Sequence, residues 1–209
     1  MENTTSSAYI LIDMQNGFID PASPLCIKNA AATVDACART MDTARQKGIP
    51  VFVVQRRYSP DASDVECTRY AGWNGGGRPL APGSHSADAP EPLRPKAGDY
   101  TVIKPRWSAF FGTNLDLILR RLGVRTVILA GTTTPNCIRT TCYDAVALDY
   151  NVVVLEDCCS SQTEIIQRVN IEDMENIGAV IMSSARFETY DKDAVPDAAA
   201  AIRAELAAR

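Results

Sequence analysis

The stretch TVILAGTTTPNC at residues 126–137 determines the kind of fold that we expect for this chain of 209 residues. Its first five residues are apolar or β-branched, which predicts a strand that is buried on both faces of a sheet. Thr134 suits the N-cap of a helix and Pro135 its first position, so we predict a helix from about Pro135 to Asp149. A buried strand that turns tightly into a helix is typical of a parallel sheet.

Short apolar runs alternate with amphipathic stretches on both sides of this unit. The further predicted strands cover residues 9–12, 51–54, 101–103, 152–155 and 179–182. The further predicted helices cover residues 30–47, residues 113–122, a stretch opened by a capping box from Ser161 to Glu164, and residues 198–209. This order predicts an α/β fold in a single domain, with a parallel sheet flanked by helices on both faces.

Composition and charge fit one domain and argue against two classes of partner. Hydrophobic residues make up 46% of the chain and the formal net charge is −4, which argues against nucleic acid or an anionic membrane as a partner. Residues 1–7 lack the apolar run of a signal peptide, so we expect a flexible tail there and one domain over residues 8–209. No apolar stretch reaches the roughly 18–20 residues of a membrane span, and we expect a cytoplasmic protein.

The cysteines and one unusual segment complete the survey. Seven cysteines are scattered along the chain and His85 is its only histidine, so we expect buried thiols and no zinc site. The segment at residues 58–98 contains Gly75, Gly76 and Gly77 and six prolines, and it is too long for an ordinary connection between a strand and a helix. We interpret this segment as an ordered functional loop over the site.

Three residues that can carry chemistry lie at or just beyond the ends of predicted strands. Asp13 ends the first strand, Lys104 ends the strand at residues 101–103, and Cys137 follows the strand at residues 126–130 across a tight turn. Ligands of open parallel sheets bind beyond the carboxyl ends of the strands. A nucleophile, a base and an electrostatic partner are the set that covalent catalysis requires, although each residue alone has an ordinary structural alternative.

The position of Cys137 in the first turn of a helix has chemical consequences. Unpaired N–H groups and the positive end of the helix dipole gather there and favour a thiolate. Such settings lower a thiol pKa from about 8.5 into a range of about 3.5–7.5. The same N–H groups are able to hold the oxyanion that forms when a thiolate attacks a carbonyl.

Three motifs resemble those of the isochorismatase-like superfamily of cysteine hydrolases. They read LIDMQNGF at residues 11–18, KPRWSAF at residues 104–110 and GTTTPNCIRTT at residues 131–141. The resemblance extends over about residues 8–182 and implies a Rossmann-like sheet of six parallel strands with an Asp–Lys–Cys triad. In that triad Asp13 takes the thiol proton, Lys104 orients Asp13, and Cys137 attacks an amide-like carbonyl to form a thioester-type intermediate.

The resemblance implies further features of the site and of the assembly. An oxyanion hole is expected from the backbone N–H groups of Thr133 and Cys137, with a cis peptide between Thr132 and Thr133. A homo-oligomer, either a dimer or a tetramer, is also expected. Nicotinamidases of this superfamily hold a metal with an Asp-x-His pair where this chain reads QRRYSPD at residues 55–61. We therefore expect neither a metal nor another cofactor.

The departures from other branches favour hydrolysis of a small amide, carbamoyl or ureido compound at a C–N bond. True isochorismatases lack the cysteine of the third motif, whereas Cys137 is present here. One alternative is hydrolysis of an enol ether with Asp13 as the general acid. The other alternative is a member of the superfamily without catalysis, acting as a binding or scaffold subunit.

Substrate contacts are harder to assign than the triad. The candidates are Gln15, Phe18, Arg56, Arg106, Trp107, Phe110 and Tyr143. A carboxylate on the substrate would suit Arg56, Arg57 or Arg106, because arginine binds carboxylates through paired hydrogen bonds. The alternatives are surface ion pairs for the arginines and core packing for the aromatic residues.

Overall fold

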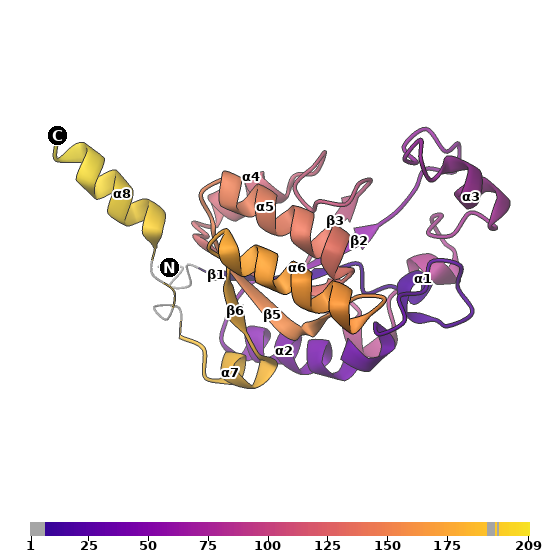
Figure 1. Ribbon diagram of the computed structural model, residues 1–209, viewed down its shortest axis with the longest axis horizontal. Coiled ribbons are helices and arrows are strands. Elements are labelled where there is room, and N and C mark those ends of the chain that lie inside the picture. The colour runs from indigo at the N-terminus through magenta and orange to yellow at the C-terminus, as the bar shows by residue number, and fades with distance from the viewer. Residues whose placement is uncertain (1–6, 192–194, 196) are drawn as a thin grey trace.

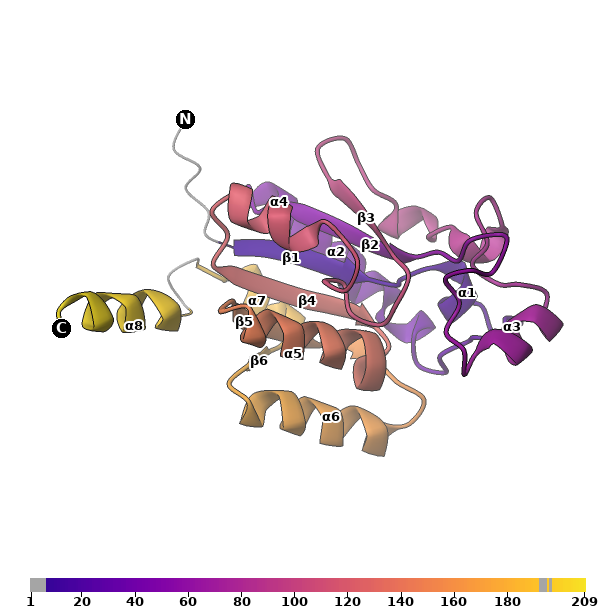
Figure 2. The same cartoon turned by 90° about the horizontal axis from the view of Figure 1, so that it is seen from above.

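The computed structural model describes residues 7–191, 195 and 197–209, and its centre is one six-stranded parallel sheet. The strands are β1 (Ser7–Ile12), β2 (Val51–Arg56), β3 (Tyr100–Lys104), β4 (Thr126–Thr132), β5 (Asn151–Ser160) and β6 (Val180–Met182). Their order across the sheet is β3-β2-β1-β4-β5-β6, so every predicted strand is present and the predicted fold class is confirmed (Figure 2).

Helices cover both faces of this sheet. They are α1 (Asn16–Ile19), α2 (Val34–Gln46), α3 (Tyr70–Gly75), α4 (Leu115–Arg121), α5 (Arg139–Ala147), α6 (Glu164–Asn176), α7 (Ser184–Glu188) and α8 (Ala198–Ala207). Shorter turns are η1 (Ala31–Thr33), η2 (His85–Ala87), η3 (Glu91–Leu93) and the π-type turn η4 (Thr134–Ile138). Figure 1 shows α2 and α7 on one face, and α4, α5 and α6 on the other.

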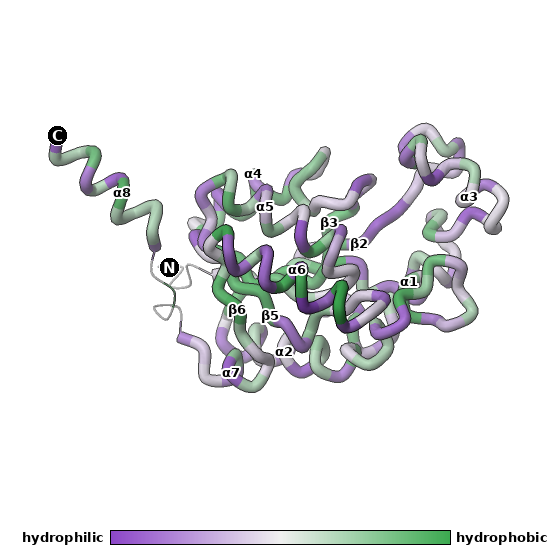
Figure 3. Tube along the Cα trace, viewed as in Figure 1, coloured by the Kyte–Doolittle hydropathy of each residue, from purple (hydrophilic) through white to green (hydrophobic). Residues whose placement is uncertain are grey.

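Alternation along each strand divides the core into two layers. On β1, Ile10 and Ile12 pack with α4, α5 and α6, whereas Tyr9 and Leu11 pack with α2 and α7. All of β1, β2 and β4 is buried, as expected for strands covered on both faces, and the tube in Figure 3 is correspondingly apolar through the sheet. A third, smaller cluster lies outside the sheet and is formed by Phe18, Tyr58, Val65, Trp73 and Leu80.

The chain reverses its direction of winding between β1 and β4, because β2 and β3 lie on one side of β1 and β5 and β6 lie on the other. Ligands of such sheets bind at this switch point. Gly131 on β4 pairs with Ile12 and has a φ of 118°, and a Cβ there would collide with the backbone of Ile12. Glycine therefore allows the two strands to end side by side at the place where a ligand would bind.

Several boundaries differ from the predictions by one or more residues, and the largest difference is at β5, which extends to Ser160. Ser7, placed in the tail, is the buried first residue of β1 and its hydroxyl hydrogen bonds to Tyr190, whereas residues 1–6 of that tail lie outside the described residues. The predicted capping box is wrong, because Thr163 and not Ser161 caps α6 by accepting a hydrogen bond from the Ile166 N–H. The N-cap before Cys137 is Thr133, one residue earlier than predicted.

The C-terminal helix α8 has no buried residue, and Figure 1 shows it apart from the sheet. Across residues 7–191, 195 and 197–209, no helix combines the length and the apolar character needed to cross a membrane.

Candidate active site

Asp13 follows β1 directly and is completely buried. Its backbone adopts the left-handed region with a φ of 53°, and its N–H donates to the Val54 carbonyl at 2.9 Å. Lys104, the last residue of β3, brings its Nζ within 2.7 Å of Asp13 Oδ2. The same ammonium donates to the Arg106 carbonyl at 2.9 Å. The structure therefore brings the predicted base and its predicted cationic partner into a buried ion pair.

Cys137 reaches the site from η4, the tight first turn that precedes α5. Its side chain is buried, and burial raises the pKa of the thiol above its ordinary value. The positive charges of Lys104 and Arg56 oppose this rise, and the negative charge of Asp13 adds to it. The prediction of a lowered pKa is therefore wrong, because the sequence reveals the helix end but not the depth of burial. The carboxylate of Asp13 is close enough to affect this thiol, and burial of both groups strengthens their interaction.

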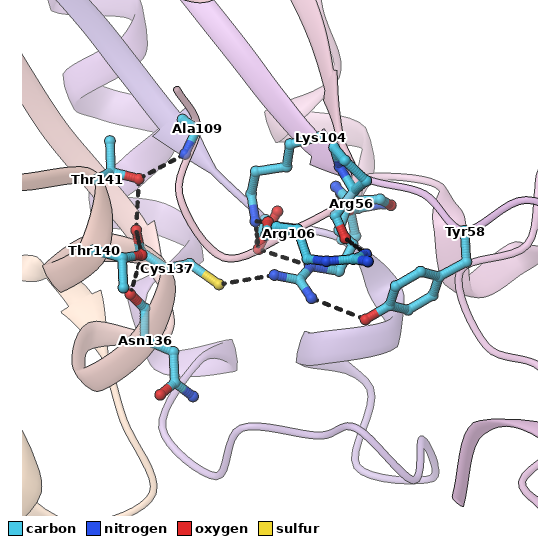
Figure 4. A network of polar contacts seen from close by, with 12 residues as sticks. Arg56, Tyr58, Lys104, Arg106, Ala109, Asn136, Cys137, Thr140 and Thr141 are labelled. Atoms are coloured by element: carbon cyan, nitrogen blue, oxygen red, sulfur yellow. Dashed lines mark hydrogen bonds and ion pairs between the residues drawn. The ribbon is translucent and has the colours of Figure 1, made fainter. Parts of the chain in front are cut away.

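Arg56 is the third charged residue delivered by a strand end, and its side chain is completely buried. Figure 4 shows its guanidinium between the sulfur of Cys137 and the ring of Tyr58. Its Nη2 lies 3.8 Å from Cys137 Sγ, its Nε lies 3.9 Å from Asp13 Oδ2, and its Nη1 lies 2.6 Å from Glu66 Oε1. Burial alone would lower the pKa of Arg56, but the charges of Cys137, Asp13 and Glu66 raise it above its ordinary range.

Gln15 has a structural task at this site. Its Oε1 accepts from the Arg56 N–H at 2.8 Å, and its Nε2 donates to the carbonyls of Arg56 at 2.9 Å and of Ala87 at 2.8 Å. These bonds occupy the side chain, so the prediction that Gln15 contacts substrate is not supported. Gln15 instead fixes the backbone at the end of β2, from which the Arg56 side chain extends.

A pocket of about 490 Å³ opens beside Cys137. It is lined by Phe18, Pro24, Leu25, Ile27, Arg56, Tyr58, Thr68, Arg69, Gly72, Trp73, Pro79, Thr133, Asn136 and Cys137. Of the predicted substrate contacts, Phe18 and Arg56 line it. Most of the wall is apolar, and its two charged side chains are both arginines. Such a pocket favours a small molecule with an apolar part and a negative group.

Arg106 and Trp107 support the pocket wall from behind. The guanidinium of Arg106 donates to the carbonyls of Asp64 and Pro105, and so it holds the 58–98 segment instead of facing the pocket. The Trp107 ring lies under the guanidinium of Arg69, with 5.5 Å between Arg69 Cζ and the ring centre. Neither residue lines the pocket, which corrects the prediction that they contact substrate.

Phe110 and Tyr143 lie elsewhere. Phe110 stacks on Tyr150, with ring centres 5.8 Å apart, and packs against the core. The Tyr143 hydroxyl donates to Asp173 Oδ2 at 2.7 Å, which ties α5 to α6. Neither ring lines the pocket, so the prediction that Phe110 and Tyr143 contact substrate is not supported, and the local sequence does not show which partner each ring packs against.

The turn between β4 and α5 matches the expected form. The peptide bond between Thr132 and Thr133 is cis. The hydroxyl oxygen of Thr134 lies 3.0 Å from the Ser160 carbonyl oxygen and 2.7 Å from Gln167 Oε1, so its one proton has an acceptor on either side and the turn is held at the end of β5. Throughout the described part of the chain, no three residues among histidine, cysteine, aspartate and glutamate are grouped so as to hold a metal ion.

Three residues of the site, Tyr58, Glu66 and Arg69, were not predicted. All three belong to the 58–98 segment, and no periodicity or turn pattern in that segment indicates which side chains face the pocket. The structure places Tyr58 two residues after the end of β2, but the predicted strand ended at residue 54 and gave no such signal.

Comparison with known proteins gives one family and several relatives. The model of the isochorismatase family, described as the isochorismatase domain, matches residues 7–186. A probable inactive nicotinamidase of Arabidopsis thaliana is 40% identical over 182 residues, or 85% of this chain and 92% of that protein. The ureidoacrylate amidohydrolase of Azorhizobium caulinodans is 28% identical over 200 residues, or 87% and 88%. The maleamate amidohydrolase of Pseudomonas putida is 30% identical over 171 residues, or 81% and 79%.

Solved structures agree with this result. An isochorismatase family protein from Desulfovibrio vulgaris has a TM-score of 0.85 at 39% identity, covering 88% of this chain and 97% of that one. The N-carbamoylsarcosine amidase from Thermoplasma acidophilum has a TM-score of 0.73 at 31% identity, covering 85% and 96%.

Proposed function

This chain belongs to the isochorismatase family, and we propose that it is a cysteine amidohydrolase with Cys137 as its nucleophile. The observation that carries the proposal is the arrangement of Asp13, Lys104 and Cys137, which three separate strand ends bring into one buried site next to a pocket. The amidohydrolases and the amidase among its relatives support the same reaction class. The Arabidopsis relative is named as a probable inactive nicotinamidase, so the reaction class rests on the other relatives and on the site.

The proposed reaction begins with proton transfer from the Cys137 thiol to Asp13. Both carboxylate oxygens of Asp13 are buried, and Lys104 contacts Oδ2 at 2.7 Å, so the lone pairs of Oδ1 remain for the proton. The sulfur attacks the amide carbon, and the backbone N–H groups of Thr133 and Cys137 receive the oxyanion. The C–N bond then breaks, Asp13 returns its proton to the departing nitrogen, and a thioester remains.

Water completes the proposed cycle. The carboxylate of Asp13 takes a proton from a water molecule, and the resulting hydroxide attacks the thioester carbon. The C–S bond breaks, the sulfur regains a proton from Asp13, and a carboxylic or carbamic acid leaves. Lys104 stays charged beside Asp13 throughout and keeps the carboxylate oriented.

We further propose that the substrate is a small amide or ureido compound with a carboxylate at its other end. Arg69 lines the pocket, and among the described residues it has no ion pair and no side-chain hydrogen bond. Arg56, by contrast, already holds Glu66. The guanidinium of Arg69 is therefore the free anchor for a carboxylate, in place of the Arg56, Arg57 or Arg106 suggested by sequence.

The test is ammonia release from a panel of carboxylate-bearing amides and ureido acids, with Cys137→Ala and Asp13→Asn beside the wild type. We expect Cys137→Ala to lower kcat by about 10⁴-fold or more and Asp13→Asn by about 10²–10⁴-fold. Cys142→Ala is the matched control, because this buried thiol lies on α5, directly after the turn that carries Cys137, and it faces the core with a pKa raised to about 12. A Cys137→Ala variant that retains most activity would exclude the thioester route and favour an enol-ether type of hydrolysis through Asp13.

A further inference from the structure

Arg56 ranks among the largest completely buried side chains of the protein. A buried guanidinium is stable only where opposite charges and hydrogen-bond acceptors surround it. Glu66 supplies one negative charge at 2.6 Å, and Asp13 supplies another at 3.9 Å. The site therefore contains two cations, Arg56 and Lys104, where an Asp–Lys–Cys triad by itself has one.

The guanidinium is fixed on one side by the 58–98 segment. Its Nη1 donates to Glu66 Oε1 at 2.6 Å and to the Tyr58 hydroxyl at 2.8 Å. That hydroxyl in turn donates to Glu66 Oε2 at 2.7 Å, which closes a ring of three side chains. The ring leaves little rotational freedom to Arg56, and so it sets the direction of the other two nitrogens.

Those other nitrogens face the reacting atoms. Nη2 lies 3.8 Å from Cys137 Sγ, and Nε lies 3.9 Å from Asp13 Oδ2 without any hydrogen-bond partner among the described residues. One cation thus spans the proton donor and the proton acceptor. Lys104, by comparison, forms its close contact with the carboxylate.

We propose that Arg56 is a further catalytic residue, which stabilises the negative charge as it moves from Asp13 to the sulfur of Cys137, and that Glu66 and Tyr58 position it. The inference rests on the proposed function, because it concerns the first step of that reaction. Proton transfer moves one negative charge from oxygen to sulfur, and both atoms are close to the same guanidinium. The charge therefore never leaves the field of a fixed cation.

An opposite charge within about 4–6 Å shifts a pKa by about 1–3 units. The groups that face the sulfur are Asp13 from the end of β1, Arg56 from the end of β2 and Lys104 from the end of β3. Burial and the negative charge of Asp13 raise the pKa of Cys137, and the charges of Arg56 and Lys104 lower it. Without the charge of Arg56, Lys104 alone opposes the rise, so the thiolate is harder to form.

The experiment is the rate of iodoacetamide labelling of Cys137 against pH in the full chain without substrate, with mass spectrometry to locate the label. We expect Arg56→Gln to raise the pH midpoint of the labelling curve by about one unit or more. At a pH below that midpoint, labelling of Cys137 should be about tenfold slower. Arg57→Gln is the matched control, because the guanidinium of this neighbouring residue contacts Gln55 and not the sulfur, and it should leave the midpoint unchanged.

Two variants of the positioning residues extend the test and remain informative should Arg56→Gln fail to fold. Tyr58→Phe removes one hydrogen bond to Arg56 at constant charge, and we expect a smaller rise of the midpoint. Glu66→Gln removes a negative charge, which alone would lower the midpoint, so a rise there identifies lost positioning.

An unchanged midpoint in Arg56→Gln overturns the inference, as does an unchanged midpoint in Tyr58→Phe together with a lowered midpoint in Glu66→Gln. The proposed function fails separately, because it requires ammonia release from an amide and this labelling does not.

Discussion

The two halves of the candidate site are built in different ways. Strand ends of one sheet deliver Asp13, Arg56 and Lys104, and the hydrogen-bonded register between Arg56 and Lys104 fixes their spacing. The 58–98 segment delivers Glu66 and six of the fourteen residues that line the pocket, and it packs through a small cluster around Tyr58 and Trp73. The reacting groups thus depend on the main core, whereas the wall that meets the rest of the substrate depends on a satellite core.

This difference separates chemistry from selectivity. A change in the satellite cluster can reshape the pocket while the register of β1, β2 and β3 stays in place. A change at the strand ends disturbs the reacting groups and the sheet together. Three predictions test this separation, beginning with the change that should have the largest effect.

Gly131→Ala should disrupt the part of the site that is built from strand ends, which we call the strand half. The added Cβ would collide with the backbone of Ile12, and a φ of 118° is strained for any residue with a side chain. Neither strand can move away without losing its ladder, so we expect the free energy of unfolding to fall by about 3 kcal/mol or more. Urea denaturation measures the loss.

Gly48→Ala is the control for that experiment, because Gly48 also has a positive φ, of 67°, but a Cβ there meets no atom. Equal losses in both variants would show that backbone conformation, and not the contact between β1 and β4, is responsible.

Arg69→Gln should affect only the part of the site that the 58–98 segment builds, which we call the loop half. Loss of a charge-assisted pair with a substrate carboxylate costs about 1.5–3 kcal/mol, which corresponds to roughly 10–150-fold in kcat/KM. Comparing a carboxylate-bearing amide with its neutral analogue measures the effect, which should be confined to the charged substrate. Arg78→Gln, an exposed arginine of the same segment that contacts Asn74, is the control. Equal losses for both substrates would mean that Arg69 shapes the wall without binding a carboxylate.

Glu66→Gln should produce the smallest effect, which should appear as a change in how far stability falls at acid pH. Burial raises the pKa of Glu66, but the charge of Arg56 and the hydrogen bond from Tyr58 outweigh burial and lower it. A lowered carboxyl pKa contributes stability above the unfolded value of about 4.3, and that stability is lost as the pH falls through the folded value.

Thermal unfolding between about pH 7 and pH 3 measures this contribution, and each kcal/mol corresponds to about 2–4 °C in Tm for a chain of this size. The variant should unfold at a lower temperature near pH 7 and lose less on acidification. Glu188→Gln, at an exposed position on α7, should follow the wild type. An unchanged acid limb in Glu66→Gln would mean that the pair with Arg56 adds no stability.

The strand half could be predicted from sequence because its signals are local. Asp13 and Lys104 each end a short apolar run, and Cys137 follows such a run across a turn, so a parallel sheet must bring all three to one edge. The same rule covers Arg56 at the end of β2. The direction of the Cys137 pKa shift could not be predicted, because desolvation depends on how many distant segments cover the sulfur.

The loop half could not be predicted, because contacts between residues far apart in sequence determine it. Nothing near Glu66 shows that its carboxylate meets Arg56, and nothing near Arg69 shows that its guanidinium lies over Trp107. The predictions of substrate contact for Phe110 and Tyr143 lack support for a related reason. An aromatic residue in or near a motif packs equally well into a core or against a pocket.

The small cluster of Phe18, Tyr58, Val65, Trp73 and Leu80 has a thermodynamic consequence for ligand capture. These side chains pack against one another beside the pocket, and the Trp73 indole donates to the Pro79 carbonyl at 2.7 Å. A ligand that enters has few rotamers to freeze, and freezing each one would cost about 0.5–1.5 kcal/mol. The ordering of this wall therefore takes place once, when the chain folds, and is not repeated with every turnover.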